Sequence, residues 1–405
     1  MKKTAFFFFL LITLPAFSAS VLRQAREALK KRSNLEQTAK NLLAEAVKPG
    51  TLHADRVECY QLAAECSQRI NEAENVKLYL KQPYDTVKFF SSIFDMYQYI
   101  QQADSVTCLP DEKGRVKILN RKKNHDLLLR YRPNLWAGAN WFFRHDQMAK
   151  AYSIFNTYIN IVNHPLFEGD KTVASDENLP MANYLAALAA YRSNNYDGLI
   201  KYSLPAKQAG QENELIQELL VRAWESKGDT VQWERELWNG MREYPHHAYF
   251  FTRLIDHLFL EDQLDKGLAV ADSLIQLDPS VPLYWYAKSQ ILIKQHKDAE
   301  VIVACDSCLA RDSNYVDALY NKGIAALNLA VIHTENACTD VTNPQSFKDQ
   351  QRIRELYQLA KQPMERVREL QPEAKDRWAA PLYRVYLNLN MGKEFDEMDR
   401  ILNGN

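Results

Sequence analysis

The sequence predicts an all-α protein, an α-solenoid of antiparallel helix pairs behind a diverged N-terminal helical block. Only 12 of the 405 residues are glycine and 15 are proline, whereas barrels, sandwiches and glycine-rich nucleotide folds need these residues at many tight turns. Helix-length segments also recur with a step of 34 residues between about 179 and 315. A fixed step of this length is typical of one elongated repeat array rather than of several globular domains.

The first residues predict an export signal. Lys2 and Lys3 precede an apolar run from Ala5 to Phe17, and small side chains at 16–19 suit a cleavage site. The run is shorter than the ~20 residues that a membrane-spanning helix needs, and no cysteine lies at the cleavage region to carry a lipid. We therefore expect a signal peptide over residues 1–19. The mature chain would be periplasmic or envelope-associated, not a lipoprotein, and without a transmembrane segment.

An N-terminal helical block is expected over residues 20–104. Its last helix has a wide apolar face that needs a partner. The block is therefore interpreted as a diverged pair of repeats or as an end cap. Helices are expected near 22–48, 54–81 and 84–104.

Two polar stretches interrupt the helical pattern. Residues 105–131 predict a loop insertion or a short ribbon, and an insertion near 334–348 lengthens a loop within the repeats. Either could make contacts, although loops also accept insertions that have no function. The repeat array spans 132–372, and residues 373–405 are expected to form C-terminal capping helices.

One register, read every 34 residues, places small or apolar side chains on the same face of each first helix. Intervals of three and four residues within each segment keep these side chains on one helix face. Prolines then recur at the unit ends, where proline stops one helix and starts the next. The register holds Ala187, Val221, Ile255, Ser289 and Gly323, and the closing prolines are Pro245, Pro279 and Pro372.

The residues of this register resemble the tetratricopeptide repeat (TPR) family. The segment from Val316 to Gly323 is similar to the opening of that repeat, and Leu277-Asp278-Pro279 is similar to its close. With the export signal, the chain is identified as an exported bacterial member. The resemblance implies a right-handed superhelix with an inner groove, a scaffold that presents a binding surface rather than chemistry.

The resemblance also implies where a partner would bind, because the first helix of each unit lines the concave face in that family. The corresponding positions are rich in aromatic side chains with scattered cations, the usual anchors of protein contacts. We expect them to bind an extended peptide or a partner helix; alternatively, the tyrosines only pack between neighbouring helices. The positions are Trp136, Asn140, Phe143, Arg144, Tyr184, Tyr191, Arg192, Tyr249, Phe259, Tyr286, Gln290, Lys294, Tyr320 and Asn328.

A more specialised function of the family is not expected. Some members grip the terminal carboxylate of a chaperone with a basic set on successive first helices, and only Asn140 and Arg144 resemble part of it. The balance of 50 basic against 51 acidic residues gives a formal net charge of -1, which offers no general attraction for nucleic acid.

Known catalytic motifs are missing from the sequence, including HExxH, GxSxG, the P-loop and GxGxxG. We therefore expect a non-enzymatic scaffold for protein–protein interaction that needs no cofactor. The alternative function is a glycan or nutrient-uptake binding component of the envelope. An accessory of an envelope hydrolase is a third and weaker interpretation.

The cysteines are the residues that could form a redox or metal site. Cys305 and Cys308 have the spacing of a redox pair, but they fall on core positions of a second helix, where cysteine acts as a small apolar side chain. Two alternatives remain open for them, a zinc site with His333 and Cys338 and a disulfide to Cys338. No metal is expected.

Overall fold

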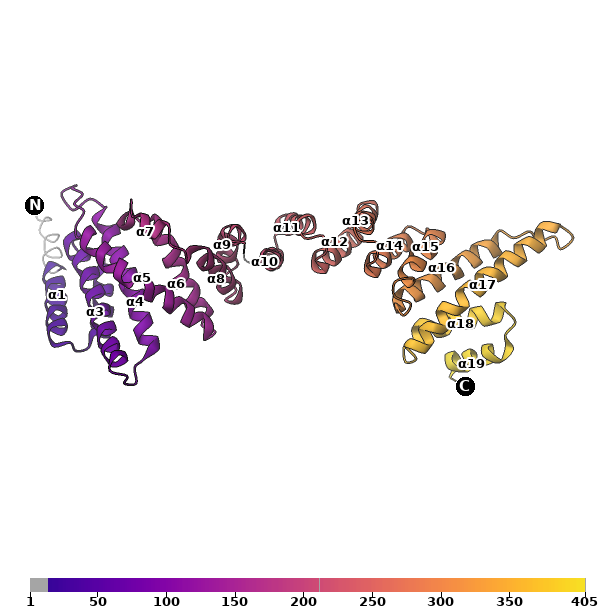
Figure 1. The fold of residues 1–405 in the computed structure, drawn as a ribbon, viewed down its shortest axis with the longest axis horizontal. Coiled ribbons are helices and arrows are strands. Elements are labelled where there is room, and N and C mark those ends of the chain that lie inside the picture. Colours follow the sequence, from indigo (N-terminus) through magenta and orange to yellow (C-terminus); the bar gives the residue numbers. More distant parts are fainter. Residues whose placement is uncertain (1–13, 211, 405) are drawn as a thin grey trace, which may run out of the picture. The chain divides into compact units, whose positions relative to one another are not determined.

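The structure is a computed structural model that describes residues 14–210 and 212–404. Over these residues the regular elements are helices, and the chain divides into two compact units, one ending at Trp233 and one beginning at Glu234 (Figure 1). The fold is therefore all-α, as the sequence predicts. None of the helices within the described ranges is long and apolar enough to cross a bilayer.

The N-terminal block forms four helices instead of the three that were expected. The expected helix over 22–48 is interrupted at Arg32 and Asn34, which adopt left-handed backbone angles with φ of 50° and 54°. The expected signal peptide lies mainly at residues 1–13, outside the described residues, and its last residues begin the first helix. The helices are α1 (Leu14–Lys31), α2 (Leu35–Ala46), α3 (His53–Tyr79) and α4 (Thr86–Thr107).

The expected loop insertion over 105–131 is wrong at both ends. Helix α4 continues to Thr107 and α5 (Arg121–Arg144) takes up the second part, so the loop itself covers only 108–120. The basic run that suggested a loop forms the first turn of α5. Arg121 is held there by the carboxylate of Asp104, which is 1% exposed, with both nitrogen–oxygen distances at 3.0 Å.

Antiparallel helix pairs follow in the expected register. The helices after α5 are α6 (Met148–Asn160), α8 (Leu179–Arg192), α9 (Tyr196–Gln208), α10 (Asn213–Lys227), α11 (Thr230–Glu243), α12 (Ala248–Leu260), α13 (Leu264–Leu277), α14 (Pro282–Lys294) and α15 (Asp298–Leu309). The C-terminal ones are α16 (Val316–Glu335), α17 (Pro344–Leu370), α18 (Lys375–Asn388) and α19 (Gly392–Asn403). Two 3-10 turns (Ile161–Asn163, Pro165–Phe167) and the short α7 (Lys171–Ala174) separate α6 from α8.

The insertion near 334–348 was expected to lengthen a loop, but residues at both of its ends belong to helices α16 and α17. Only residues 336–343 connect α16 to α17, and α17 runs for 27 residues. The side chain of Asn343 accepts a hydrogen bond from the backbone N–H of Gln345, and Pro344 occupies the first turn. This pairing of a capping side chain with an early proline is a strong helix start.

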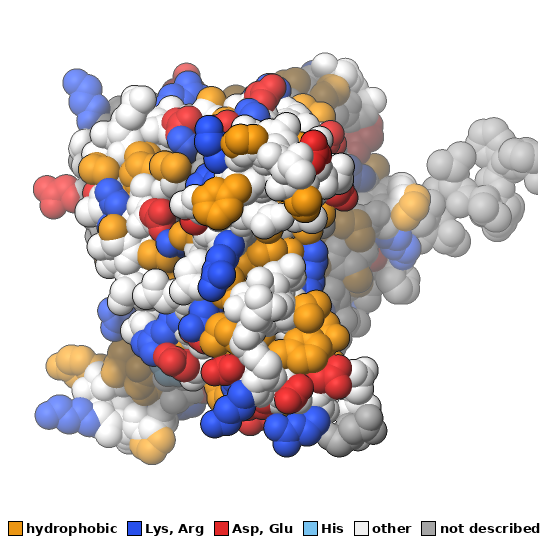
Figure 2. Space-filling model, turned by 90° about the vertical axis from the view of Figure 1, so that its right-hand side faces the viewer, with side chains coloured by type: hydrophobic (Ala, Val, Ile, Leu, Met, Phe, Trp, Pro, Cys, Tyr) orange, Lys and Arg blue, Asp and Glu red, His pale blue; other side chains and the backbone are white. Residues whose placement is uncertain are grey.

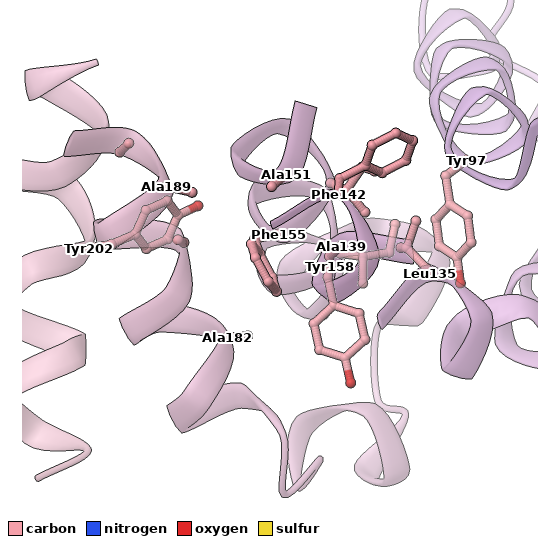
Figure 3. Packing of buried hydrophobic residues seen from close by; sticks show 14 of the residues in the cluster. Tyr97, Leu135, Ala139, Phe142, Ala151, Phe155, Tyr158, Ala182, Ala189 and Tyr202 are labelled. Carbon is pink, nitrogen blue, oxygen red and sulfur yellow. The ribbon is translucent and has the colours of Figure 1, made fainter. Parts of the chain in front are cut away.

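The core of the first unit lies between its helix pairs. Figure 3 shows Phe142 of α5 beside Ala151 and Phe155 of α6, and Ala182 and Ala189 on α8. All of these side chains are almost completely buried. The alanines of α8 let neighbouring helices approach closely because they carry no side chain beyond Cβ.

The second unit ends in a closed core of α16 to α19. Trp378, Leu382 and Tyr386 of α18 are buried against this core, and the ring of Tyr383 lies 4.6 Å from that of Phe395 on α19. The apolar face of α18 is thus covered within its own unit. On the face drawn in Figure 2, basic and acidic side chains are interspersed with apolar ones, in keeping with the near-zero net charge.

Candidate functional site

The structure brings the ends of α5 and α8 together in the first unit. The guanidinium of Arg192 lies 5.8 Å from the ring centre of Phe143 and 2.9 Å from a carboxylate oxygen of Asp146. Arg144, the next residue of α5, is exposed. One aromatic ring and one guanidinium of the predicted set therefore lie together here, and their binding of a partner stays a prediction.

Two other predicted residues of α5 are engaged inside their own helix pair. The indole of Trp136 lies 5.7 Å from the ring of Phe155 and 5.5 Å from that of Tyr158, both on α6. Asn140 donates a hydrogen bond of 2.9 Å to the backbone carbonyl of Trp136. Trp136 thus packs between α5 and α6, and Asn140 is bonded within α5.

The tyrosines of α8 are half-buried, and the hydroxyl of one of them has a hydrogen-bond partner. The hydroxyl of Tyr184 donates to Glu212 at 2.7 Å. Burial, and then this hydrogen bond to a carboxylate, raise the pKa of Tyr184 to about 12. Tyr191 lies with its ring 6.4 Å from that of Tyr196 at the start of α9. Each ring keeps some exposed surface for a partner.

In the second unit, the clearest pairing joins α12 and α14. Lys294 donates a hydrogen bond of 2.7 Å to the carbonyl of Phe259, and its ammonium lies 4.5 Å from the centre of that ring. Asp262 lies 3.1 Å from the same ammonium. Tyr286 accepts a hydrogen bond from Gln290, and its ring lies 5.0 Å from Tyr315.

The remaining predicted residues of this unit lie apart from that pairing. Tyr249, on α12, has its ring 5.5 Å from that of Phe250. The guanidinium of Arg377 on α18 lies 4.7 Å from the ring centre of Tyr320. Asn328 is exposed and donates to Asp298 at 3.0 Å. The structure therefore brings Phe143 together with Arg192 and Phe259 together with Lys294, but not the predicted set as a whole, and binding by these residues stays a prediction.

The cysteine pair lies in the core rather than in a reactive setting. Cys305 and Cys308 are both buried, and burial raises the pKa of each thiol to about 12. A redox cysteine needs the opposite shift, because the thiolate is the reactive form. All six cysteines are free thiols, and no group of metal-binding side chains was found among the described residues.

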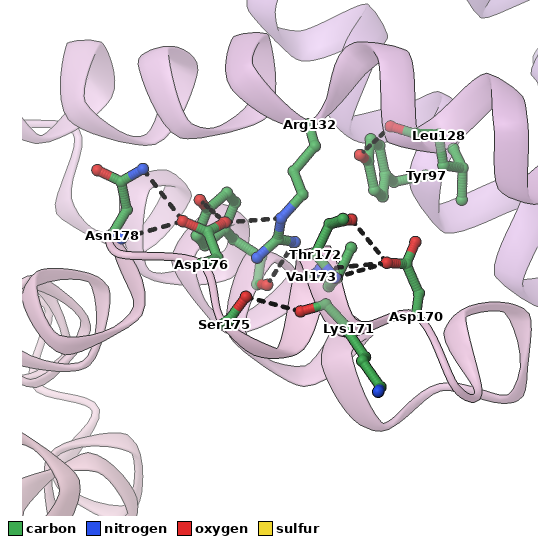
Figure 4. A network of polar contacts seen from close by, with 11 residues as sticks. Tyr97, Leu128, Arg132, Asp170, Lys171, Thr172, Val173, Ser175, Asp176 and Asn178 are labelled. Carbon is green, nitrogen blue, oxygen red and sulfur yellow. Dashed lines mark hydrogen bonds and ion pairs between the residues drawn. The ribbon is translucent and has the colours of Figure 1, made fainter.

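A buried polar network under α5 was missed by the sequence analysis. Figure 4 shows Arg132 of α5 reaching the carboxylate of Asp176, just before α8, at 2.8 Å. Asp176 also accepts from the hydroxyl of Tyr158. Nearby, His125 lies 2.9 Å from Asp170, which caps α7. These contacts fix the segment between α6 and α8, where two aspartates six residues apart were the only sequence signal.

An apolar hollow of about 580 Å³ between α11 and α13 was also missed. It lies on second helices, whose outward positions are usually polar in such arrays. Apolar side chains three and four residues apart on each helix would have indicated it. The hollow is lined by Trp238, Met241, Arg242, Lys266, Ala269, Val270, Ser273 and Leu274.

Comparison with known proteins gives likenesses among solved structures only. No protein-family model and no curated protein matches the chain. The C-terminal part of a TPR repeat-containing protein from Cytophaga hutchinsonii is 13% identical, with a TM-score of 0.41, over 64% of this chain and 91% of that one.

Two further structures are similar at lower scores. MamA from Desulfovibrio magneticus is 10% identical over 44% of this chain and 94% of its own, with a TM-score of 0.29. YrrB, described as a TPR protein with an unusual peptide-binding site, is 13% identical over 64% and 96%, with a TM-score of 0.24. These scores are low, so the assignment depends on the helix pairs and their 34-residue register. On the basis of its helix pairs and their 34-residue register, the chain has the fold of the tetratricopeptide repeat family.

Proposed function

We propose that the chain is a non-enzymatic scaffold for protein–protein contacts in the bacterial cell envelope. It binds a peptide or a partner helix through the aromatic faces of its first helices. One observation supports this most directly: in each unit an aromatic ring and a cation from neighbouring first helices lie together, Phe143 with Arg192 and Phe259 with Lys294. Such pairs combine apolar area with directed charge, which suits the anchor residues of a protein partner.

The half-buried state of these side chains fits the same function. A ring that is already held by its neighbours loses little side-chain freedom when a partner covers it, so binding costs less conformational entropy. Tyr184 and Tyr286 are held in this way by Glu212 and Gln290. The location of the chain in the envelope is proposed from the apolar N-terminal run and its cleavage site.

The test is affinity capture of the tagged full chain from cross-linked envelope extracts, with partners identified by mass spectrometry. One variant carries Tyr184→Ala and Tyr191→Ala in the first unit, and another carries Tyr286→Ala and Tyr320→Ala in the second. The matched control carries Leu204→Ala and Val303→Ala, which are exposed apolar residues of the second helices α9 and α15.

We expect at least one tyrosine variant to lose partners that the control retains, while circular dichroism shows unchanged helix content. Retention of every partner by both tyrosine variants would contradict the proposed binding faces. Cell fractionation tests the location: a chain that stays uncleaved in the cytoplasm would contradict export. If no protein is captured and a glycan array is bound instead, the alternative function is favoured.

A further inference from the structure

The turn between α3 and α4 exposes an unusual amount of apolar surface. We call residues 75–88 the α3–α4 tip; Figure 1 shows this connection at the edge of the first unit. Tyr79 is 85% exposed. Exposed single apolar residues are common, but a contiguous group on a soluble surface usually marks an interaction site. The exposed large apolar side chains of the tip are Val76, Leu78, Tyr79, Leu80 and Val87.

The backbone of the tip is fixed, so this exposure is built into the fold. Lys81, two residues after the end of α3, adopts the left-handed region with φ of 56°. The buried side chain of Glu74 accepts a hydrogen bond of 2.9 Å from the backbone N–H of Asp85. Asp85 in turn caps α4 by accepting from the backbone N–H of Lys88 at 2.9 Å. The apolar side chains are therefore held outward by a closed turn.

Cations surround the apolar side chains. The tip carries Lys77, Lys81 and Lys88 against a single acidic residue, Asp85. Lys77 is paired with Glu74 and Lys88 with Glu36, each at 2.8 Å. In the part of the chain that the structure describes, Lys81 has no ion pair.

The turn between α1 and α2 adds to this positive charge. A hollow of about 380 Å³ has both Arg32 and Lys88 in its wall, so this turn lies beside the tip. Lys30, Lys31 and Arg32 follow one another there, and no ion pair to a described residue engages any of the three. The wall of that hollow also contains Glu36 and Glu74, which pair with Lys88 and Lys77, so the positive charge at this end comes from Lys30, Lys31, Arg32 and Lys81.

We propose that the α3–α4 tip docks on an anionic lipid surface. Leu78, Tyr79 and Leu80 enter the boundary between headgroups and acyl chains, and Lys81 and Arg32 contact the headgroups. Aromatic and basic side chains are enriched at this depth of a bilayer, and anionic lipids attract nearby cations. None of the residues of this surface is among those proposed to bind protein, and the contact would hold the scaffold against a membrane.

The shape of the tip favours a lipid surface over a peptide. A hollow of about 440 Å³ at the tip is lined by Asn75, Val76, Leu78, Tyr79 and Leu80. All of these residues belong to the end of α3 and the residue that follows it, and among the described residues no second helix contributes a wall. A peptide or helix is gripped between two elements in a groove, whereas a bilayer needs only an exposed apolar turn with cations around it.

The test places an environment-sensitive fluorophore at the tip. The full chain carries Leu80→Cys labelled with nitrobenzoxadiazole, with Cys108→Ser and Cys338→Ser so that the two accessible native thiols do not react. The matched control carries the label at Leu204→Cys, another exposed leucine, in the same background. A local probe is needed because the apolar run at residues 5–17 could itself bind vesicles.

With vesicles of phosphatidylglycerol and phosphatidylcholine, we expect a blue shift and increased emission from the label at residue 80 but not at residue 204. No response at residue 80 would overturn the proposal, whatever the total binding. A response that appears without vesicles and grows with protein concentration would also overturn it, in favour of contact with a second copy of the chain.

Charge variants test the basic side of the surface. Lys81→Gln with Arg32→Gln should weaken the vesicle-dependent signal at residue 80 by roughly ten- to thirty-fold in lipid concentration. The matched control is Arg384→Gln with Lys393→Gln, which removes two exposed cations from the second unit and should leave the signal unchanged. Equal binding to pure phosphatidylcholine vesicles, or no effect of the first pair, would contradict a charge-assisted lipid contact.

Discussion

The guanidinium of Arg132 and the carboxylate of Asp176 form an ion pair with a nitrogen–oxygen distance of 2.8 Å, and their side chains are only 6% and 13% exposed. The pair joins α5 to the residues just before α8. Arg132 also donates to the backbone carbonyl of Tyr158 at 3.1 Å. One arginine thus holds together three segments that are far apart in the sequence.

Breaking this pair on one side should destabilise the first unit strongly. Asp176→Asn leaves the Arg132 charge buried without its carboxylate, and losing one partner of a buried pair costs about 3–5 kcal/mol. Urea denaturation followed by circular dichroism measures the change. The control is Asp146→Asn, which breaks the exposed pair with Arg192 and should cost less than about 1 kcal/mol. Equal effects of the two variants would contradict a structural role for the buried pair.

The neighbouring His125 should make stability depend on pH. Burial lowers its pKa, but the hydrogen bonds that its ring N–H groups donate to the carboxylates of Asp126 and Asp170 outweigh burial, so the folded-state pKa is raised above 6.5. The folded state then holds the proton more tightly than the unfolded state, and this contribution is complete below pH 6.5 and is lost as pH rises through the raised value. Unfolding free energies of the native chain and of His125→Gln, measured from pH 5.5 to 8.5, should converge as pH rises.

The matched control for this pH dependence is His333→Gln, at an exposed position on α16. Its difference from the native chain should not follow the His125 profile. A constant difference between the native chain and His125→Gln across the whole range would contradict the proposed linkage.

Glycine positions offer a test of helix spacing. A Cβ at Gly198 in α9 would lie 2.7 Å from the ring of Tyr152, whereas a Cβ at Gly392 would meet no atom within 4 Å. A rigid ring cannot yield easily, so Gly198→Ala should destabilise by about 1–3 kcal/mol. Gly392→Ala, in the first turn of α19, should be neutral or stabilising by up to about 1 kcal/mol. Thermal melts of both variants check this, and equal shifts in melting temperature would be evidence against the close packing at Gly198.

The sequence predicts the repeated helices well because periodicity within a helix and a fixed step between helices are local signals. It predicts helix-length segments that recur between about 179 and 315, and helices α8 to α15 lie within that range. It misreads residues 121–131, because the partner that holds Arg121 at the start of α5 is Asp104, 17 positions earlier and on another helix. That contact has no periodic signature, so only the fold reveals it.

The candidate site was predictable in residue type but not in detail. Aromatic side chains at first-helix positions follow from the register, yet their state depends on partners from other segments. Tyr184 is held by Glu212, which precedes α10, and Tyr320 lies under Arg377 of α18. Likewise, Val76, Leu78, Tyr79 and Leu80 resemble an ordinary apolar helix end until the fold shows that they are exposed and that no helix of the described ranges covers them.

Thiol reactivity should separate the six cysteines into distinct classes. Burial raises the pKa of Cys59, Cys66, Cys305 and Cys308 to about 12, so each has very little thiolate at neutral pH, and a reagent cannot reach it. Cys108 is exposed and Cys338 is half-buried. With Ellman's reagent at pH 8, Cys108 should react first and Cys338 more slowly, and the other four should react only after unfolding in urea.

The same titration tests the two alternatives for the cysteine pair. A disulfide from Cys338 to Cys305 or Cys308 would leave four reactive thiols in urea instead of six, and a zinc site would release metal as the thiols react. Cys108→Ser should remove the fast phase and nothing else. Rapid reaction of Cys305 or Cys308 in the folded chain would contradict their burial in the core, since a thiol with a raised pKa becomes reactive only when the helix pair opens.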